Sequence, residues 1–351
     1  MKYRFGIIGL GMIADMHARA ILDIPGAELV AGYHYKMEKA EHFSKQFGGT
    51  PYDSLEAFLA HPDLDIVTIC TPSGLHMDSA VAAAEAGKHL IIEKPLEVTV
   101  DRCDAIIEAA EKHKVLLAGI FPSRFHDVSR VVKEAVEAGR LGTVVLADAY
   151  VKWYRSQEYY SSSGWKGTWA LDGGGALMNQ SIHAVDLLQW FMGPVSEIQA
   201  VCGTLAHEGI EVEDTAAAVL RFASGAIGVI EGTTGAYPGF LKKIEITGSK
   251  GSVFMEEENL KVWDFAEGQP EDEKIRKQFS TKTKSAGGAA DPAAIGYHGH
   301  RKQFEDMIRA LETGGRPLVD GNEARKAVEI IQGIYASARE DRPVKLPLEY
   351  T

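Results

Sequence analysis

The sequence has few cysteines, no excess of basic residues and no cluster of metal ligands, and each shortage excludes a class of protein. Its three cysteines, Cys70, Cys103 and Cys202, are widely spaced and form no CxxC pair, so we predict no disulfide framework, no metal site and a reducing compartment. The 37 basic residues face 49 acidic ones, for a formal net charge of -12. Without a basic block, neither nucleic acid nor an anionic membrane is a predicted partner.

Long hydrophobic stretches are also missing. No segment approaches the roughly 20 uncharged apolar residues that cross a bilayer, and the apolar run at the amino terminus, broken by Gly6 and Gly9, lacks the long core of a secretory signal. We therefore expect a cytoplasmic protein. The composition is ordinary for a globular chain, with 45% hydrophobic and 25% charged residues. At roughly 150 residues per domain, the 351 residues predict two domains.

The first 121 residues alternate short apolar runs with helical patterns. The candidate strands are residues 4–8, 28–33, 66–70, 89–92 and 115–119. The candidate helices between them are residues 12–23, 37–47, 54–61, 76–87 and 101–113. Continuous apolar strands suit a parallel sheet that is covered on both faces. We predict a doubly wound, Rossmann-type α/β domain over residues 1–121.

After residue 121 the pattern changes to longer strands joined by hairpin signals. The candidate strands are residues 144–154, 211–222, 226–235, 242–247 and 252–255. The candidate helices, which we expect to pack on this sheet, are residues 127–138, 177–192, 298–312 and 322–338. Residues 267–294 are expected to be a long loop. We predict an α+β domain over residues 122–351, with an open, mainly antiparallel sheet that carries helices on one face.

A glycine motif follows the first candidate strand. Residues 9–14 read GLGMIA, which matches GxGxxA at the point where a strand turns into a helix. The first glycine allows the turn, the second lets a pyrophosphate approach the backbone, and the small last residue lets helix and strand pack closely. The βαβ context predicts a dinucleotide site. Its candidate contacts are Gly9, Gly11, Met12 and Ile13.

The second candidate strand ends without the carboxylate that usually accepts hydrogen bonds from the ribose of NAD. His34, Tyr35 and Lys36 stand there instead. Lys36 could contact a 2'-phosphate and Tyr35 could lie against adenine, whereas the alternative makes Lys36 a solvated loop cation. The choice between NAD and NADP therefore stays open.

Two further loops are expected at the carboxyl edge of the parallel sheet, where doubly wound proteins bind ligands. The third strand ends in residues 70–76 (CTPSGLH), and the fourth ends in residues 93–95 (EKP). An ammonium group at Lys94 would polarise a carbonyl or stabilise an alkoxide. The candidate cofactor contacts in these loops are Thr71, Pro72, Ser73, His76, Glu93 and Lys94.

A run of three glycines, residues 173–175, leads into the predicted helix of the second domain. Asn179 and His183 follow it, four residues apart and hence on one face of an α-helix. A histidine can take the proton of an alcohol or return it, although a lone helical histidine is more often structural.

Aromatic residues concentrate just before these glycines. Aromatic faces stack on the CH faces of sugar rings, while core packing or a subunit contact is the competing explanation. Arg124 could reach a hydroxyl or a carboxylate, and Tyr297 opens a helix, where simple capping is the alternative. The candidate substrate contacts are Arg124, Tyr154, Trp165, Trp169, Asn179, His183 and Tyr297.

In this order and spacing, the motifs resemble those of the Gfo/Idh/MocA family of oxidoreductases, the glucose-fructose oxidoreductase and inositol dehydrogenase type. The resemblance rests on residues 9–14, 71–76, 93–95 and 173–186 and covers nearly the whole chain. It implies NAD or NADP as cofactor, and hydride exchange between nicotinamide C4 and a carbinol carbon of a sugar, cyclitol or sugar derivative. It also implies a homodimer or homotetramer formed through the carboxyl-terminal sheet.

The resemblance implies roles for single residues as well. Lys94 would bind cofactor and substrate and stabilise the alkoxide, His183 would be the acid/base, and the Lys94–Pro95 peptide would be cis. The family's usual aspartate is Asn179 here, which can hydrogen-bond to a substrate hydroxyl but cannot act as a carboxylate. Two alternatives remain: an NAD-dependent glycosidase that uses transient hydride transfer, and a cofactor-bound sugar sensor without turnover.

Overall fold

The computed structural model describes residues 3–280 and 296–348, and their contacts divide the chain into two compact units. The first unit combines the chain up to Pro122 with residues 296–328, and the second combines residues 123–295 with residues 329–351. The functional division into residues 1–121 and 122–351 stays a prediction. No helix in the described ranges is both long and apolar enough to span a bilayer.

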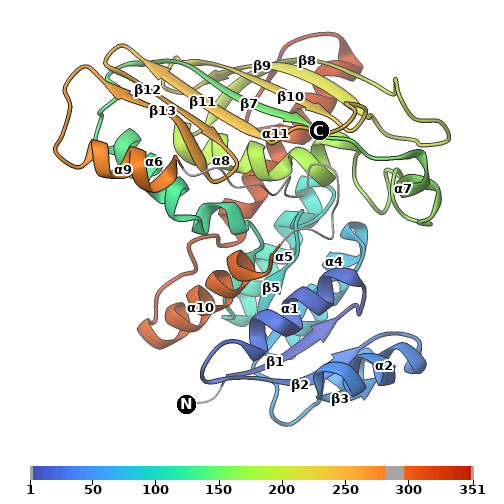
Figure 1. Ribbon diagram of the computed structural model, residues 1–351. Helices are drawn as coiled ribbons and strands as arrows, with labels where there is room; N and C mark the ends of the chain where they lie inside the picture. Colours follow the sequence, from blue (N-terminus) through green and yellow to red (C-terminus); the bar gives the residue numbers. More distant parts are fainter. Residues whose placement is uncertain (1–2, 281–295, 349–351) are drawn as a thin grey trace. The chain divides into compact units, whose positions relative to one another are not determined.

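A six-stranded parallel sheet forms the centre of the first unit, in the order β3-β2-β1-β4-β5-β6 (Figure 1). Its strands are β1 (Tyr3–Ile8), β2 (Ala27–Tyr33), β3 (Thr50–Tyr52), β4 (Ile66–Ile69), β5 (His89–Ile92) and β6 (Leu117–Gly119). The predicted doubly wound domain is confirmed, with its order reversal between β1 and β4. Only the short β3 was not predicted, because three residues carry too little pattern.

Helices connect these strands and cover the sheet. They are α1 (Met12–Leu22), α2 (Met37–Phe47), α3 (Leu55–Leu59), α4 (His76–Glu85) and α5 (Val100–His113), with the short 3-10 turn η1 (Ser73–Leu75). The 3-10 turn η2 (Pro122–Phe125) follows β6, and its residues from 123 on belong to the second unit. All four residues of β4 are buried, as expected for a strand covered on both faces.

The helix α10 (His298–Thr313) corrects one expectation, because it packs in the first unit and not on the second sheet. It lies against α1, and its Phe304 meets the ring of Phe5 edge-on at 5.8 Å. The side chain of Gln303 donates a hydrogen bond to the carbonyl of Gly119 over 2.8 Å. Helical periodicity shows which face is apolar but not which surface it covers.

The second unit contains an eight-stranded sheet in the order β13-β12-β11-β7-β10-β9-β8-β14. Its strands are β7 (Val144–Lys152), β8 (Val195–Gly203), β9 (Thr215–Phe222), β10 (Ile227–Thr233), β11 (Lys243–Gly248), β12 (Gly251–Glu256), β13 (Asn259–Phe265) and β14 (Val344–Lys345). The sheet is mainly antiparallel as predicted, but it is not a simple meander: β7 lies between β10 and β11 and pairs with β10 in parallel. The strands β8, β13 and β14 were not predicted.

The helices of the second unit are α6 (Asp127–Glu137), α7 (Gln157–Ser161), α8 (Ile182–Met192), α9 (Asp272–Phe279) and the carboxyl-terminal part of α11 (Gly321–Glu340). In Figure 1, α8 lies against one face of the sheet. The helix α9 corrects the predicted loop at residues 267–294, because Arg140 and Trp263 hold its Asp272 carboxylate. Residues 281–294 of that predicted loop lie outside the described residues.

Apolar side chains stand exposed on several strands of this sheet. Val201 of β8, Val219 of β9 and Ile227 of β10 are 74%, 53% and 45% exposed. Their strand neighbours alternate between buried and exposed, because successive side chains of a strand point to opposite faces. The sheet thus buries one face under helices and leaves apolar side chains on the other.

Candidate cofactor and substrate site

The glycine motif forms a tight turn between β1 and α1. Gly9 has φ +85°, and a Cβ there would lie 2.7 Å from the backbone nitrogen of Thr71, so a larger residue does not fit. Gly11 is the N-cap of α1 without a side-chain cap, and a Cβ there would meet no described atom within 4 Å. The backbone N–H groups that open α1 thus lie at an open surface, which fits a dinucleotide pyrophosphate.

The helix after this turn is anchored by its small residue. Ala14 is fully buried, as the motif requires for close packing of helix on sheet. Met12 is exposed and Ile13 is half-buried at the start of α1. Both candidates therefore border the open surface beside Gly11.

A positively charged corner follows β2. Tyr35 is 71% exposed, the His34 ring stacks on it at 4.5 Å, and the Lys36 ammonium lies 5.6 Å from its centroid. His34 Nδ1 accepts the backbone N–H of Lys36 over 3.0 Å. Burial, with the charges of Lys39 and Lys36, lowers the pKa of His34. Lys36 and Lys39 are therefore the cations beside His34 at this corner.

His76 joins the two loops that follow β4 and β5. The ring is buried, with Nε2 3.0 Å from the carbonyl oxygen of Thr71 and Nδ1 3.0 Å from that of Pro95. Pro72 caps the turn η1, which begins at Ser73. The two candidate loops are thereby held side by side at the carboxyl edge of the sheet.

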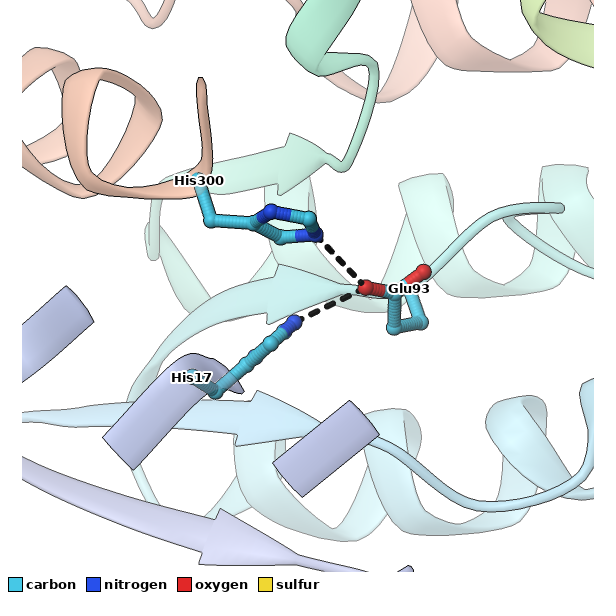
Figure 2. A group of neighbouring side chains, drawn as sticks. All are labelled: His17, Glu93 and His300. Carbon is cyan, nitrogen blue, oxygen red and sulfur yellow. Dashed lines mark hydrogen bonds and ion pairs between the residues drawn. The ribbon is translucent and has the colours of Figure 1, made fainter. Parts of the chain in front are cut away.

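Glu93 is the centre of a buried polar cluster at the end of β5 (Figure 2). One carboxylate oxygen lies 2.8 Å from Nε2 of His17 and 3.4 Å from Nε2 of His300. The other accepts the backbone N–H of Lys94 over 2.9 Å. Burial alone would raise the pKa of Glu93, but the two histidines lower it well below its usual range. The Lys94–Pro95 peptide is cis, which confirms that expectation.

In the second unit, Glu213 and Tyr335 hold the glycine run. A Cβ at Gly174 would lie 2.1 Å from the Tyr335 hydroxyl, and one at Gly175 would lie 1.8 Å from the Glu213 carbonyl oxygen. The Glu213 carboxylate accepts the N–H groups of Gly175 and Leu177 and the Tyr335 hydroxyl over 3.0, 2.8 and 3.0 Å. Close packing thus requires these glycines, and Glu213 anchors the segment that carries Asn179.

Asn179 lies in a π-helical segment, η3 (Ala176–Ser181), whereas His183 lies in the first turn of α8. The expectation of one α-helical face is therefore corrected, because a π-helix has a wider turn and another spacing. Asn179 Nδ2 donates to the Asp172 carboxylate over 2.6 Å, and the same carboxylate accepts the N–H of Gly167 over 2.9 Å. A buried aspartate thus orients the Asn179 amide.

Three further substrate candidates of the second unit contact other side chains. Arg124 is fully buried, and its Nε and Nη2 donate to Asp186 over 2.9 and 2.7 Å. Tyr154 meets Tyr237 edge-on at 5.2 Å. Trp169 is exposed and meets Tyr335 edge-on, also at 5.2 Å.

The last two candidates, Trp165 and Tyr297, lie in different units. The carbonyl of Trp165 accepts the Thr168 hydroxyl over 2.7 Å. Tyr297 is the N-cap of α10 and packs on the core of the first unit. Its placement beside the Rossmann sheet could not be read from a helix-capping pattern alone.

Several polar residues of both units were not singled out as site residues: His17, His300, Glu213 and Tyr335. Each is buried in the structure. A histidine within a helix and an acid before a strand have no local pattern that separates them from surface residues. Their burial comes from contacts between elements that lie far apart in the chain.

Comparison with known proteins agrees with this fold. Residues 3–120 match the oxidoreductase family model with an NAD-binding Rossmann fold, and residues 129–254 match the GFO/IDH/MocA C-terminal domain. The WlbA dehydrogenase from Bordetella pertussis, solved with NADH and UDP-GlcNAcA, is 35% identical over 99% of both chains, with a TM-score of 0.90. A levoglucosan dehydrogenase solved with NADH and levoglucosan is 26% identical over 99% of this chain and 100% of its own length, with a TM-score of 0.85.

A curated relative extends the match. The myo-inositol 2-dehydrogenase of Thermotoga maritima is 28% identical over 98% of both chains. Fold, glycine turn and relatives define an NAD-binding oxidoreductase. The chain belongs to the Gfo/Idh/MocA family, as its motifs predict.

Proposed function

We propose that the protein is an NAD(P)-dependent dehydrogenase that oxidises a carbinol carbon of a sugar, cyclitol or sugar derivative. The observation that carries the proposal is the placement of Lys94: it follows β5 at the carboxyl edge of the Rossmann sheet, in a loop held by Glu93 and His76. The carboxyl edge is where doubly wound proteins bind ligands. The Lys94 ammonium there stabilises the alkoxide that forms as the alcohol loses its proton.

The second unit supplies the acid/base in this proposal. His183 takes the hydroxyl proton during oxidation and returns it during reduction, and the bound nicotinamide supplies the hydride acceptor or donor. Asn179, whose amide is oriented by Asp172, hydrogen-bonds to a substrate hydroxyl. The positions of Gly174 and Gly175 against Tyr335 and Glu213 support this role, because they fix the start of the segment that carries Asn179.

A nucleotide-linked sugar is the substrate class that we propose to test first. The WlbA dehydrogenase, whose structure holds NADH and UDP-GlcNAcA, shares 35% identity over the full length. The levoglucosan and myo-inositol enzymes share 26% and 28%. Free sugars and cyclitols are therefore the second class to test.

A dehydrogenase assay tests this function. Purified protein with NAD or NADP is given UDP-GlcNAcA, UDP-GlcNAc, levoglucosan or myo-inositol, and the reduced nicotinamide is followed at about 340 nm while products are identified by mass spectrometry. We expect one substrate class to give reduced cofactor, and Lys94→Ala and His183→Ala each to lower kcat by about a hundredfold or more. Activity that survives Lys94→Ala would contradict the assignment.

The same assay separates the two alternatives. A glycosidase that uses transient hydride transfer would release phenol from an aryl glycoside without net reduced cofactor. A sensor would bind sugar in calorimetry and form no product.

We also propose that the chain assembles into a homodimer or homotetramer through the exposed face of the second sheet. Val201, Val219 and Ile227 stand exposed there. Exposed apolar side chains on neighbouring strands are stabilised when a second copy covers them.

A further inference from the structure

We infer that His17, Glu93 and His300 form a positioning network that holds the backbone of Lys94 in place. The inference rests on the proposed function, in which Lys94 acts on the substrate. It assigns a task to two histidines from different helices, neither of which belongs to a predicted catalytic set.

The network joins four elements of the first unit through one carboxylate. His17 comes from α1, Glu93 follows β5, and His300 comes from the first turn of α10 (Figure 2). Nδ1 of His17 also lies 2.8 Å from the hydroxyl of Thr68 on β4. Glu93 also accepts the Lys94 N–H. A shift of any of these elements therefore changes the position of the Lys94 backbone.

The positions of the hydrogens explain these contacts. The Nε2–H group of His17 donates a hydrogen bond to one Glu93 oxygen, and Nδ1 of His17 then accepts the Thr68 hydroxyl. Nε2 of His300 faces the same Glu93 oxygen as an ion-pair partner at 3.4 Å. Burial lowers the pKa of His17, and the two histidines lower that of Glu93. The result is an ionised carboxylate that accepts the N–H groups of His17 and Lys94 and pairs with His300 at 3.4 Å, and these contacts stabilise the buried charge.

The histidines are also held by ring contacts. The ring of His17 lies 5.3 Å from that of His300 and 5.2 Å from that of Phe304. Phe304 is on α10, one turn after His300, and packs in the core of the unit. The network is therefore rigid enough to fix a backbone position.

The same three residues could instead ligate a metal ion, because their ligand atoms lie within 4.8 Å of one another. The separation of 2.8 Å between His17 and Glu93 favours the hydrogen bond. Ligand atoms around tetrahedral zinc, each about 2.0 to 2.1 Å from the ion, lie about 3.3 Å apart. The number of metal ions per chain is therefore measured as part of the test.

Two variants of His300 separate hydrogen bonding from packing. His300→Gln keeps an N–H donor toward Glu93, whereas His300→Leu removes it at similar volume. His298→Leu is the matched control, because His298 lies on the same turn of α10 but is exposed. Glu93→Gln removes the carboxylate charge of the network and replaces one acceptor oxygen by a donor. This variant provides the test if His300→Leu fails to fold.

The first measurement needs no substrate. Amide hydrogen exchange, read by mass spectrometry on a peptide that spans residues 89–98, reports the protection of the Lys94 N–H. We expect about tenfold faster exchange in His300→Leu and Glu93→Gln, and the wild-type rate in His300→Gln and His298→Leu. Unchanged exchange in Glu93→Gln would overturn the inference.

The second measurement is the split between kcat and binding. We expect His300→Leu to lower kcat by about tenfold and His300→Gln to stay within about twofold of wild type, with the Kd of NADH changed less than threefold in both. Equal kcat for the Leu and Gln variants would contradict positioning. A metal content of about one ion per wild-type chain, lost in His300→Leu, would also contradict positioning. If no sugar is oxidised by the wild type, the proposed function fails, while the exchange measurement still decides the network.

Discussion

Glu213 makes the stability of the second unit depend on pH. Its carboxyl group is buried, and burial raises its pKa from 4.5 to about 7. The N–H groups of Leu177 and Gly175 and the hydroxyl of Tyr335 favour the charged form and offset part of that rise. The folded protein therefore keeps the Glu213 proton at a pH where the unfolded chain has lost it.

The sign and size of the effect follow from linkage. Between pH 4.5 and pH 7 the folded state binds more protons than the unfolded state, so the free energy of unfolding falls as pH rises. A difference of about 2.5 pKa units, at about 1.4 kcal/mol per unit, corresponds to about 3 kcal/mol. This contribution is fully present below pH 4.5 and is lost above about pH 7.

Urea unfolding followed by tryptophan fluorescence measures this contribution. All 5 tryptophans lie between residues 153 and 263, in the second unit, so the signal reports the unit that contains Glu213. The comparison variant is Glu213→Gln, which cannot titrate, and Glu211→Gln is the control because Glu211 is exposed two residues away. Other groups titrate equally in all three proteins and cancel in the differences.

We expect the wild type to lose about 3 kcal/mol relative to Glu213→Gln between pH 4.5 and pH 7.5. Glu211→Gln should follow the wild type at every pH. A difference between wild type and Glu213→Gln that stays constant with pH, or that grows in favour of the wild type, would refute the reasoning.

Three further predictions concern a glycine, the cofactor and assembly. Gly175→Ala should lower the free energy of unfolding by about 3 kcal/mol or more, because its Cβ would meet the Glu213 carbonyl at 1.8 Å. The control is Gly164→Ala, whose Cβ would have no described atom within 4 Å. It should change the free energy of unfolding by less than about 1 kcal/mol in the same urea assay. Lys36→Ala should raise the Kd of NADPH about tenfold and that of NADH less than twofold, measured by fluorescence titration. Equal changes in the two Kd values would argue that Lys36 is a solvated loop cation. Val219→Lys should dissociate the oligomer in sedimentation experiments, and an unchanged mass would contradict assembly through this face.

Local sequence patterns predicted most of the first unit. The apolar runs of β1, β4 and β5 and the helical patterns between them appear in the structure with nearly the expected bounds. The glycine turn is equally local, because Gly9 needs a positive φ and Gly11 needs open backbone. Local patterns did not identify the short strand β3, which has too few residues. They also did not identify β8 and β13, which lack a clear alternation of apolar and polar residues.

The sequence by itself determined the family, the cofactor turn and most elements of the Rossmann sheet, because each depends on motifs and patterns within short stretches of the chain. Only the tertiary structure decided that β7 lies between β10 and β11, that α10 packs on α1, and that the segment of Asn179 is π-helical. It also brought His300 to Glu93. These arrangements depend on which distant apolar and polar surfaces complement one another, and that complementarity has no signature in local spacing.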